Sequence, residues 1–149
     1  MNGKVGKLLT IFCAGGICYG LVEIANRGFS HITMGILGGI SLIVIHILNG
    51  ERRKGSISVV TVMIISGLFI TSAEFIAGEY LNRFLHLGIW SYNEMPLNID
   101  GQICLPFTFL WIILSFVGVF ADDFIRYRIF GEEKNYSYFG NKMIKMRKI

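Results

Sequence analysis

Residues 57–81, ISVVTVMIISGLFITSAEFIAGEYL, decide the fold class. The stretch has no proline and no charged residue before Glu74. A bilayer core about 30 Å thick needs roughly 20 apolar residues per crossing helix, whereas a soluble amphipathic helix carries polar residues at every third or fourth position. The stretch lacks that alternation, so it predicts a helix that spans a membrane.

Three further apolar blocks lie around this one, at about residues 8–25, 32–48 and 103–120. The chain has 149 residues, 53% of them hydrophobic, with a mean hydropathy of +0.58. The second block is short, but tilt or local thinning of the bilayer accommodates such a span. We predict an all-α polytopic membrane protein. It is a bundle of about four transmembrane helices in one domain, residues 1–149, with a basic tail at 122–149.

The first block could be read as a signal peptide, because Lys4 and Lys7 precede it. No clear small-residue cleavage site follows, and Glu23 and Arg27 interrupt the expected exit. We therefore expect this helix to be retained.

The basic residues predict the orientation. Twelve of the 14 lysines and arginines lie in the N-terminus, the loop NGERRKGS (49–56) and the tail, and only Arg27 and Arg83 lie in the other two loops. The positive-inside rule places both termini in the cytoplasm. The net charge of +4 then reflects topology anchors and contacts with anionic lipids rather than nucleic-acid binding. Residues 138–149 could form an interfacial amphipathic helix or a disordered basic tail.

A polar segment, WSYNEMPLNIDGQ (residues 90–102), separates the third and fourth apolar blocks. Glu74 and Glu23 lie inside the spans on the same side, where a charge costs on the order of 3 kcal/mol and is seldom without a role. We predict an outward-facing polar pocket beneath this segment. Its candidate residues are Glu23, Arg27, His31, Glu74, Asn82, Trp90, Tyr92, Asn98 and Gln102.

Simpler interpretations exist for several of these residues. Glu23 and Arg27 are four residues apart and could form only an ion pair in the headgroup region. Trp90, Tyr92 and especially Trp111 fit an aromatic belt at the membrane surface. In the opposite halves of the spans His46 is the only ionisable group predicted, and we interpret it as a histidine satisfied at a helix interface.

Motifs typical of several kinds of catalytic site are absent from the sequence. The chain has no G-x-x-x-x-G-K-[ST] phosphate loop, no H-E-x-x-H zinc pair and no G-x-S-x-G nucleophile elbow. We expect no catalytic residue, no metal and no cofactor, and we favour a protein that is not an enzyme. Cys13, Cys18 and Cys104 have neither metal nor disulfide spacing, and we expect them to be small buried packing residues.

Two patterns bear on helix packing. EIANR (23–27) and EYLNR (79–83) share E-x-x-N-R, which a duplicated helical hairpin would produce and which chance also allows. The pairs Gly16/Gly20 and Gly35/Gly39 form G-x-x-x-G motifs, which let helices approach closely within one chain or between chains.

Three runs resemble a known family: YGLVEIANRGFSHITMGILGG (19–39), AEFIAGEYLN (73–82) and IWSYNEMPLNIDGQICLPFTFLW (89–111). They look like the small multi-pass membrane proteins named ABC-transporter type IV permeases, the CmpB-like group. The matching positions are Glu23, Arg27, Gly28, His31, Glu74, Gly78, Asn82, Trp90, Tyr92, Pro96, Asn98, Gly101, Gln102, Ile103, Cys104 and Leu105. Ser91 and Asn93 depart from the family pattern, which has an acidic residue after the tryptophan and a serine two residues later.

The resemblance implies a transport-related, permease-like subunit. With the candidate pocket it predicts binding or passage of a small solute, with a separate ATPase, lipids and either a second copy or other membrane subunits as partners. The rival interpretation is a non-transporting membrane protein, which would be an accessory or sensor subunit or a lipid-modifying enzyme that uses the same Glu, Arg and His cluster.

Overall fold

Four long helices build the protein, as the apolar blocks predict. The computed structural model describes residues 3–134 and Tyr138. The elements run α1 (Gly3–Arg27), α2 (Ile32–Lys54), α3 (Val59–Gly78), η1 (Glu79–Phe84), β1 (Asn98–Ile99), β2 (Ile103–Cys104) and α4 (Leu105–Arg128). Each of α1, α2, α3 with η1, and α4 is long and apolar enough to cross a membrane.

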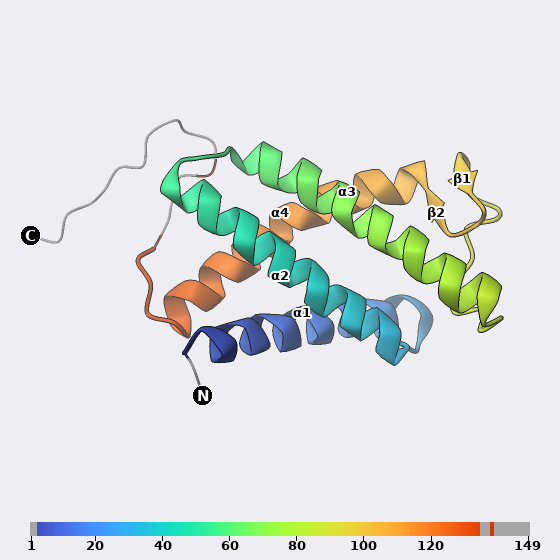
Figure 1. Cartoon of the computed structure of the whole chain (residues 1–149), viewed down its shortest axis with the longest axis horizontal. Coiled ribbons are helices and arrows are strands. Elements are labelled where there is room, and N and C mark those ends of the chain that lie inside the picture. Colours follow the sequence, from blue (N-terminus) through green and yellow to red (C-terminus); the bar gives the residue numbers. More distant parts are fainter. Residues whose placement is uncertain (1–2, 135–137, 139–149) are drawn as a thin grey trace, which may run out of the picture.

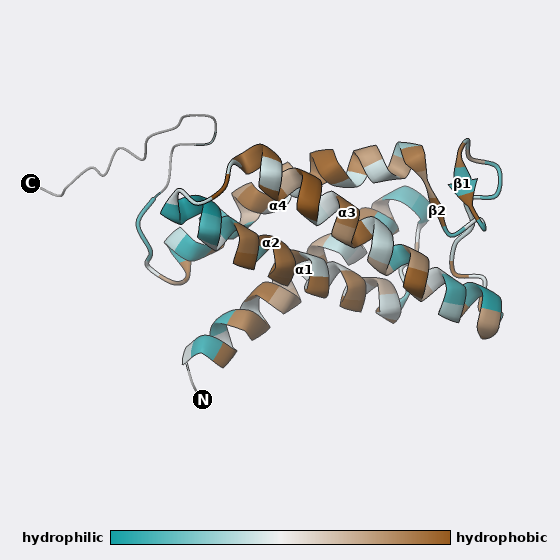
Figure 2. Ribbon diagram, turned by 45° about the horizontal axis from the view of Figure 1, so that its top comes forward, coloured by the Kyte–Doolittle hydropathy of each residue, from teal (hydrophilic) through white to brown (hydrophobic). Residues whose placement is uncertain are grey.

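The helices run up and down and cross one another at an angle (Figure 1). The start of α1, the α2–α3 connection and the end of α4 gather at one end, which we call the arginine end. The α1–α2 connection, η1 and the β1–β2 hairpin lie at the other, which we call the loop end. Hydrophilic residues concentrate at both ends, and the middle is hydrophobic (Figure 2).

Local signals set where the helices begin and end. Within lipid, a helix satisfies its own backbone hydrogen bonds, so apolar sequence becomes helix and polar residues mark the ends. The Ser58 side chain caps α3 by accepting from the Thr61 amide, and His31 caps α2 in the same way. Gly55 ends α2 in the left-handed conformation, with φ of 86°.

Glycines allow the closest helix crossings. A Cβ at Gly16 would stand 2.8 Å from the Gly35 carbonyl oxygen, and one at Gly15 would stand 2.5 Å from that of Gly38. The glycine pairs of the sequence therefore pack α1 against α2 within one chain. A Cβ at Gly67 would lie 2.3 Å from the Ile112 side chain, so α3 and α4 cross equally closely.

The loop end contains the irregular backbone. After Gly78 the third helix widens into the π-helical η1, a form often found at functional sites. Strands β1 and β2 pair antiparallel, with Asn98 opposite Cys104. Asp100 and Gly101 both have positive φ, 51° and 69°, as the centre of a type I′ turn requires.

The last helix extends beyond its apolar block to Arg128, so its final two turns add charged side chains to the bundle. One expectation needs correction. Cys104 is buried as expected, but Cys13 and Cys18 are exposed on α1, where the membrane rather than the core would surround them.

Candidate functional site

Glu74 is the most deeply buried charged group at the loop end. It lies on the face of α3 that meets α4, and only 1% of it is exposed. Its Oε2 accepts a hydrogen bond of 2.8 Å from the indole Nε1 of Trp111. Its Oε1 is also buried and has no hydrogen-bond partner among the described residues. Buried carboxylates are normally paired, so a buried oxygen without a partner is unusual.

The Glu23–Arg27 pair of α1 belongs to the same cluster. Arg27 donates to Glu23, and its other terminal nitrogen donates to the Ile89 carbonyl at 2.9 Å. Glu23 interacts electrostatically with Glu74 across the bundle. The ion pair was predicted, but it faces the protein rather than only the headgroups, because Arg27 binds the backbone just before the polar segment.

Two tyrosine hydroxyls lie between these charges. Tyr19 of α1 and Tyr92 of the polar segment each interact electrostatically with Glu74, Glu23 and Arg27. Burial, followed by the negative charge of Glu74, raises the pKa of Tyr92, so its hydroxyl stays neutral and keeps its proton. We call Tyr19, Glu23, Arg27, Glu74, Tyr92 and Trp111 the Glu74 cluster.

Aromatic rings form a continuous row beside Glu74. The Tyr19 and Trp111 rings are 5.8 Å apart, the Trp111 and Phe107 rings 6.4 Å, and the Phe107 and Tyr92 rings 4.7 Å. Trp111 is only 8% exposed. The interpretation of Trp111 as a surface belt anchor is therefore wrong, because its ring lies inside the bundle and its N–H binds a carboxylate.

Asn82 fixes the polar segment to the third helix. Its Nδ2 donates to the Trp90 carbonyl at 3.1 Å and to Gln102 Oε1 at 2.9 Å, and its Oδ1 accepts from the Ile89 amide at 2.7 Å. The Trp90 indole in turn donates to the Gln102 carbonyl at 3.0 Å. Gly78 makes this possible, because a Cβ there would lie 2.4 Å from Gln102 Oε1.

The remaining predicted residues serve local structure. Asn98 holds the hairpin turn, because its side chain accepts from the Gly101 amide and donates to the Met95 carbonyl. His31 caps α2 and contacts Thr33. The structure thus brings Glu23, Arg27, Glu74 and Tyr92 together. Asn82, Trp90, Asn98 and Gln102 hold the cover, and His31 lies apart from both groups in its contacts.

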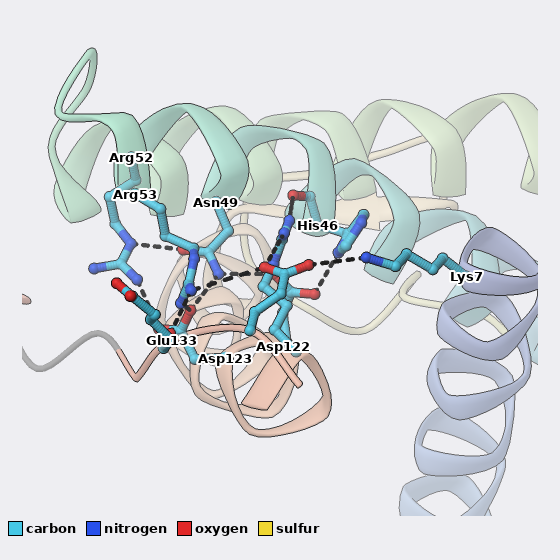
Figure 3. Close-up of polar contacts among 10 residues, drawn as sticks. Lys7, His46, Asn49, Arg52, Arg53, Asp122, Asp123 and Glu133 are labelled. Carbon is cyan, nitrogen blue, oxygen red and sulfur yellow. Dashed lines mark hydrogen bonds and ion pairs between the residues drawn. The ribbon is translucent and has the colours of Figure 1, made fainter. Parts of the chain in front are cut away.

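A second polar cluster, at the arginine end, was not predicted. Asp122 of α4 is fully buried and accepts from His46 Nδ1 at 2.5 Å, Asn49 Nδ2 at 2.7 Å and Arg126 Nε at 2.8 Å (Figure 3). His46 is therefore a satisfied interface histidine, as expected. It is not the only ionisable group in that half of the bundle, since Asp122 and Arg126 share it.

Asp123 completes this arginine cluster. Its carboxylate accepts from Asn49 at 2.9 Å, Arg52 at 2.6 Å and Arg53 at 2.8 Å. The segment after α4 adds Glu132, which binds Arg126 at 3.1 Å and Lys7 at 3.2 Å. Burial raises the pKa of Glu132, but bonding to Arg126 and Lys7 outweighs it and leaves that pKa below its ordinary range.

The arginine cluster was missed because the fourth span was predicted to end too early. Helical spacing offered the signal, since Asp122 and Arg126 lie four residues apart, and so do Asn49 and Arg53. Within the described residues, no group of three His, Cys, Asp or Glu side chains could hold a metal ion.

A hollow described by the structure lies elsewhere. A groove of about 570 Å³ opens between α2 and α3, lined mainly by apolar side chains with Thr33, Ser72 and Tyr80 among them. None of the predicted site residues lines it. Its apolar surface suits lipid tails rather than a polar solute.

The chain is similar to one known protein family. The family described as "Putative ABC-transporter type IV", ABC_trans_CmpB, matches residues 10–139. The chain belongs to this family. No curated protein and no solved structure matches it. Together with the four spanning helices, membership of the ABC_trans_CmpB family supports a transport-related membrane protein.

Proposed function

We propose that this ABC_trans_CmpB member is a permease-like subunit that binds a small solute at the Glu74 cluster, beneath the polar segment. The observation that carries the proposal is the open oxygen of a carboxylate that is 1% exposed. A buried carboxylate is stable in its charged form only when paired, as Asp122 and Asp123 are. Among the described residues Glu74 has the Trp111 N–H as its hydrogen-bond donor and no cationic partner, so its other oxygen is available to a ligand.

The surroundings of Glu74 suit a site that opens toward the loop end. Hydrogen bonds of Asn82 and Gln102 hold the polar segment above it. Each such bond contributes only about 1 kcal/mol, so the segment can move away without a large loss of free energy. The arginine end, by contrast, is closed by a network of buried ion pairs. Solute therefore enters from the loop end, which the positive-inside rule assigns to the outside of the bacterial cell membrane.

Partners follow from this arrangement. The chain has no phosphate-loop motif, so ATP-driven transport needs a separate ATPase. Four spans are few for a complete pathway, so we propose that the working unit contains a second copy or another membrane subunit.

The decisive experiment compares three versions in cells from which the gene has been deleted: wild type, Glu74→Gln and Glu79→Gln. Glu79 is a matched control, since it pairs with Arg83 on the exposed side of η1. Deletion should change the distribution of at least one small solute between cells and medium. Wild type and Glu79→Gln should restore it, and Glu74→Gln should not, at equal amounts of inserted protein. Equal restoration by all three would remove Glu74 as the site, and no change on deletion would remove the transport role.

The orientation has its own test. Single cysteines at Asn93 and Gly55, in a chain whose native cysteines are replaced by serine, report the two ends of the bundle. A membrane-impermeant maleimide should label position 93 in intact cells and position 55 only after permeabilisation. The opposite pattern would invert the protein and with it the direction from which solute enters.

A further inference from the structure

We propose that the ligand of the Glu74 cluster is a small organic ammonium ion that carries at least one N–H group. This inference rests on the proposed function, because it names the chemical class of the solute bound at the same site. Its basis is a juxtaposition of three features: a buried carboxyl without a cationic partner among the described residues, an acceptor oxygen without a hydrogen bond, and a row of aromatic rings.

The charge of the cluster selects a cation. Glu23 and Arg27 form an ion pair and cancel, and Arg27 places its other terminal nitrogen on the Ile89 carbonyl. Glu74 has no arginine, lysine or histidine partner among the ion pairs of the described residues. A buried carboxyl without a counter-charge keeps its proton, so the cluster gains an excess negative charge only when Glu74 releases that proton. A cation that binds as the proton leaves keeps the cluster neutral, whereas an anion or a neutral solute cannot replace the proton's charge.

The open oxygen selects an N–H donor. Oε2 of Glu74 is occupied by the Trp111 indole, and Oε1 is buried without a partner among the described residues. An ammonium group that donates to Oε1 supplies both the missing charge and the missing hydrogen bond. Charge-assisted hydrogen bonds of this kind are about twice as strong as neutral ones.

The aromatic row selects an organic cation over a metal ion. Trp111 donates to the carboxylate, and the Tyr19 and Phe107 rings lie 5.8 and 6.4 Å from the Trp111 ring. Ring faces attract ammonium groups within about 6 Å of their centres. The same ring faces would also pack against the alkyl carbons of an organic ammonium ion. Hard metal cations instead need several oxygen ligands at once, and the open oxygen of Glu74 offers one.

The test uses the purified full-length protein in nanodiscs and four probes at equal ionic strength: propylammonium, tetramethylammonium, propionate and sodium. Binding is followed by the thermal unfolding temperature and by tryptophan fluorescence, since Trp111 contacts Glu74. Wild type and Glu79→Gln should bind propylammonium. The Kd should weaken about tenfold or more in Glu74→Gln, the loss expected for one charge-assisted hydrogen bond. Tetramethylammonium, which has no N–H, should bind more weakly than propylammonium.

A second variant guards against misfolding of Glu74→Gln. Tyr19→Leu keeps the carboxylate but removes one aromatic face, so it should weaken propylammonium binding while leaving the circular dichroism spectrum unchanged. Propylammonium binding that is equal in wild type and Glu74→Gln would overturn the inference, and so would failure to bind it at all. Glu74-dependent binding of propionate would overturn the ammonium class but leave the proposed solute site in place. Cells that show no Glu74-dependent solute redistribution would instead remove the transport role itself.

Discussion

The two ends of the bundle treat buried carboxylates in opposite ways. At the arginine end, Asp122 and Asp123 are surrounded by arginines, an asparagine and a histidine, and each accepts at least three hydrogen bonds (Figure 3). At the loop end, Glu74 is buried just as deeply but receives one hydrogen bond, from a neutral indole. Both arrangements remove charge from solvent, but only the first supplies opposite charge in return.

We interpret this difference as that between a structural cluster, at the arginine end, and a proposed binding site, at the loop end. A saturated network stabilises one arrangement of helices, because moving any member leaves a buried charge unpaired. A carboxyl with an unused acceptor oxygen contributes little to stability and can still bind a ligand. The arginine cluster joins α2, α4 and the segment after α4, and we propose the Glu74 cluster as the place where another molecule binds.

The largest effect on stability is expected from Asp122→Ala. The substitution leaves Arg126 without its nearest carboxylate and His46 and Asn49 without their shared acceptor. Breaking a buried charge network by removing one partner costs about 3–5 kcal/mol. Equilibrium unfolding in detergent micelles measures it, with Glu51→Ala as the control because Glu51 pairs with Lys54 in an exposed bridge. A loss no larger than that of the control would mean that the arginine cluster is not structural.

Asn82→Ala should have the next largest effect. It removes three hydrogen bonds that fasten the polar segment, with an expected cost of about 1–3 kcal/mol. Hydrogen exchange at the Ile89 amide should accelerate, because that amide donates to Asn82. Asn26→Ala is the matched control, since Asn26 occupies the same place in the first E-x-x-N-R copy and is exposed. Similar effects in the two variants would show that Asn82 does not hold the cover.

Acid should weaken the arginine end by a smaller amount through Glu132. The pKa of Glu132 is lower in the folded protein than in the unfolded chain, so its pairing with Arg126 and Lys7 stabilises the fold above the ordinary glutamate range. That contribution is lost as the pH falls through the lowered pKa. Unfolding measured between about pH 6 and pH 3 should show a loss that is reduced in Glu132→Gln. An identical pH profile for both proteins would contradict the assignment.

The smallest effect on stability should come from Glu74→Gln. Glutamine retains a side-chain oxygen for the Trp111 indole and removes an uncompensated charge, so the free energy of unfolding should change by less than about 1 kcal/mol or increase. The measurement is the same micelle unfolding assay used for Asp122→Ala. A loss approaching that of Asp122→Ala would remove the distinction between the two ends.

The sequence predicted the fold class well, because hydropathy over 20 residues is a strong and local signal. The family and the cluster of Glu23, Arg27, Glu74 and Tyr92 also followed from residues that stand out within or beside apolar stretches. Contacts between distant helices did not follow. Nothing local to Trp111 indicates that its indole meets Glu74, 37 residues away.

Residues that look alike in the sequence also differ in the structure. Both E-x-x-N-R copies form the same ion pair, Glu23–Arg27 and Glu79–Arg83. The second asparagine, Asn82, lies in η1 and binds the polar segment, whereas Asn26 of the first copy is exposed on α1. The duplicated hairpin stays a prediction.

One face of α4 has a mechanical consequence. Trp111, Ser115, Val119, Asp122 and Arg126 are all buried and share that face. It reaches from the Glu74 cluster to the arginine cluster, about 16 Å along the axis at the helical rise. If α4 moves as a rigid body, a ligand that displaces the Trp111 indole also displaces Asp122. Occupancy of the Glu74 cluster would then alter the arginine cluster through this one helix.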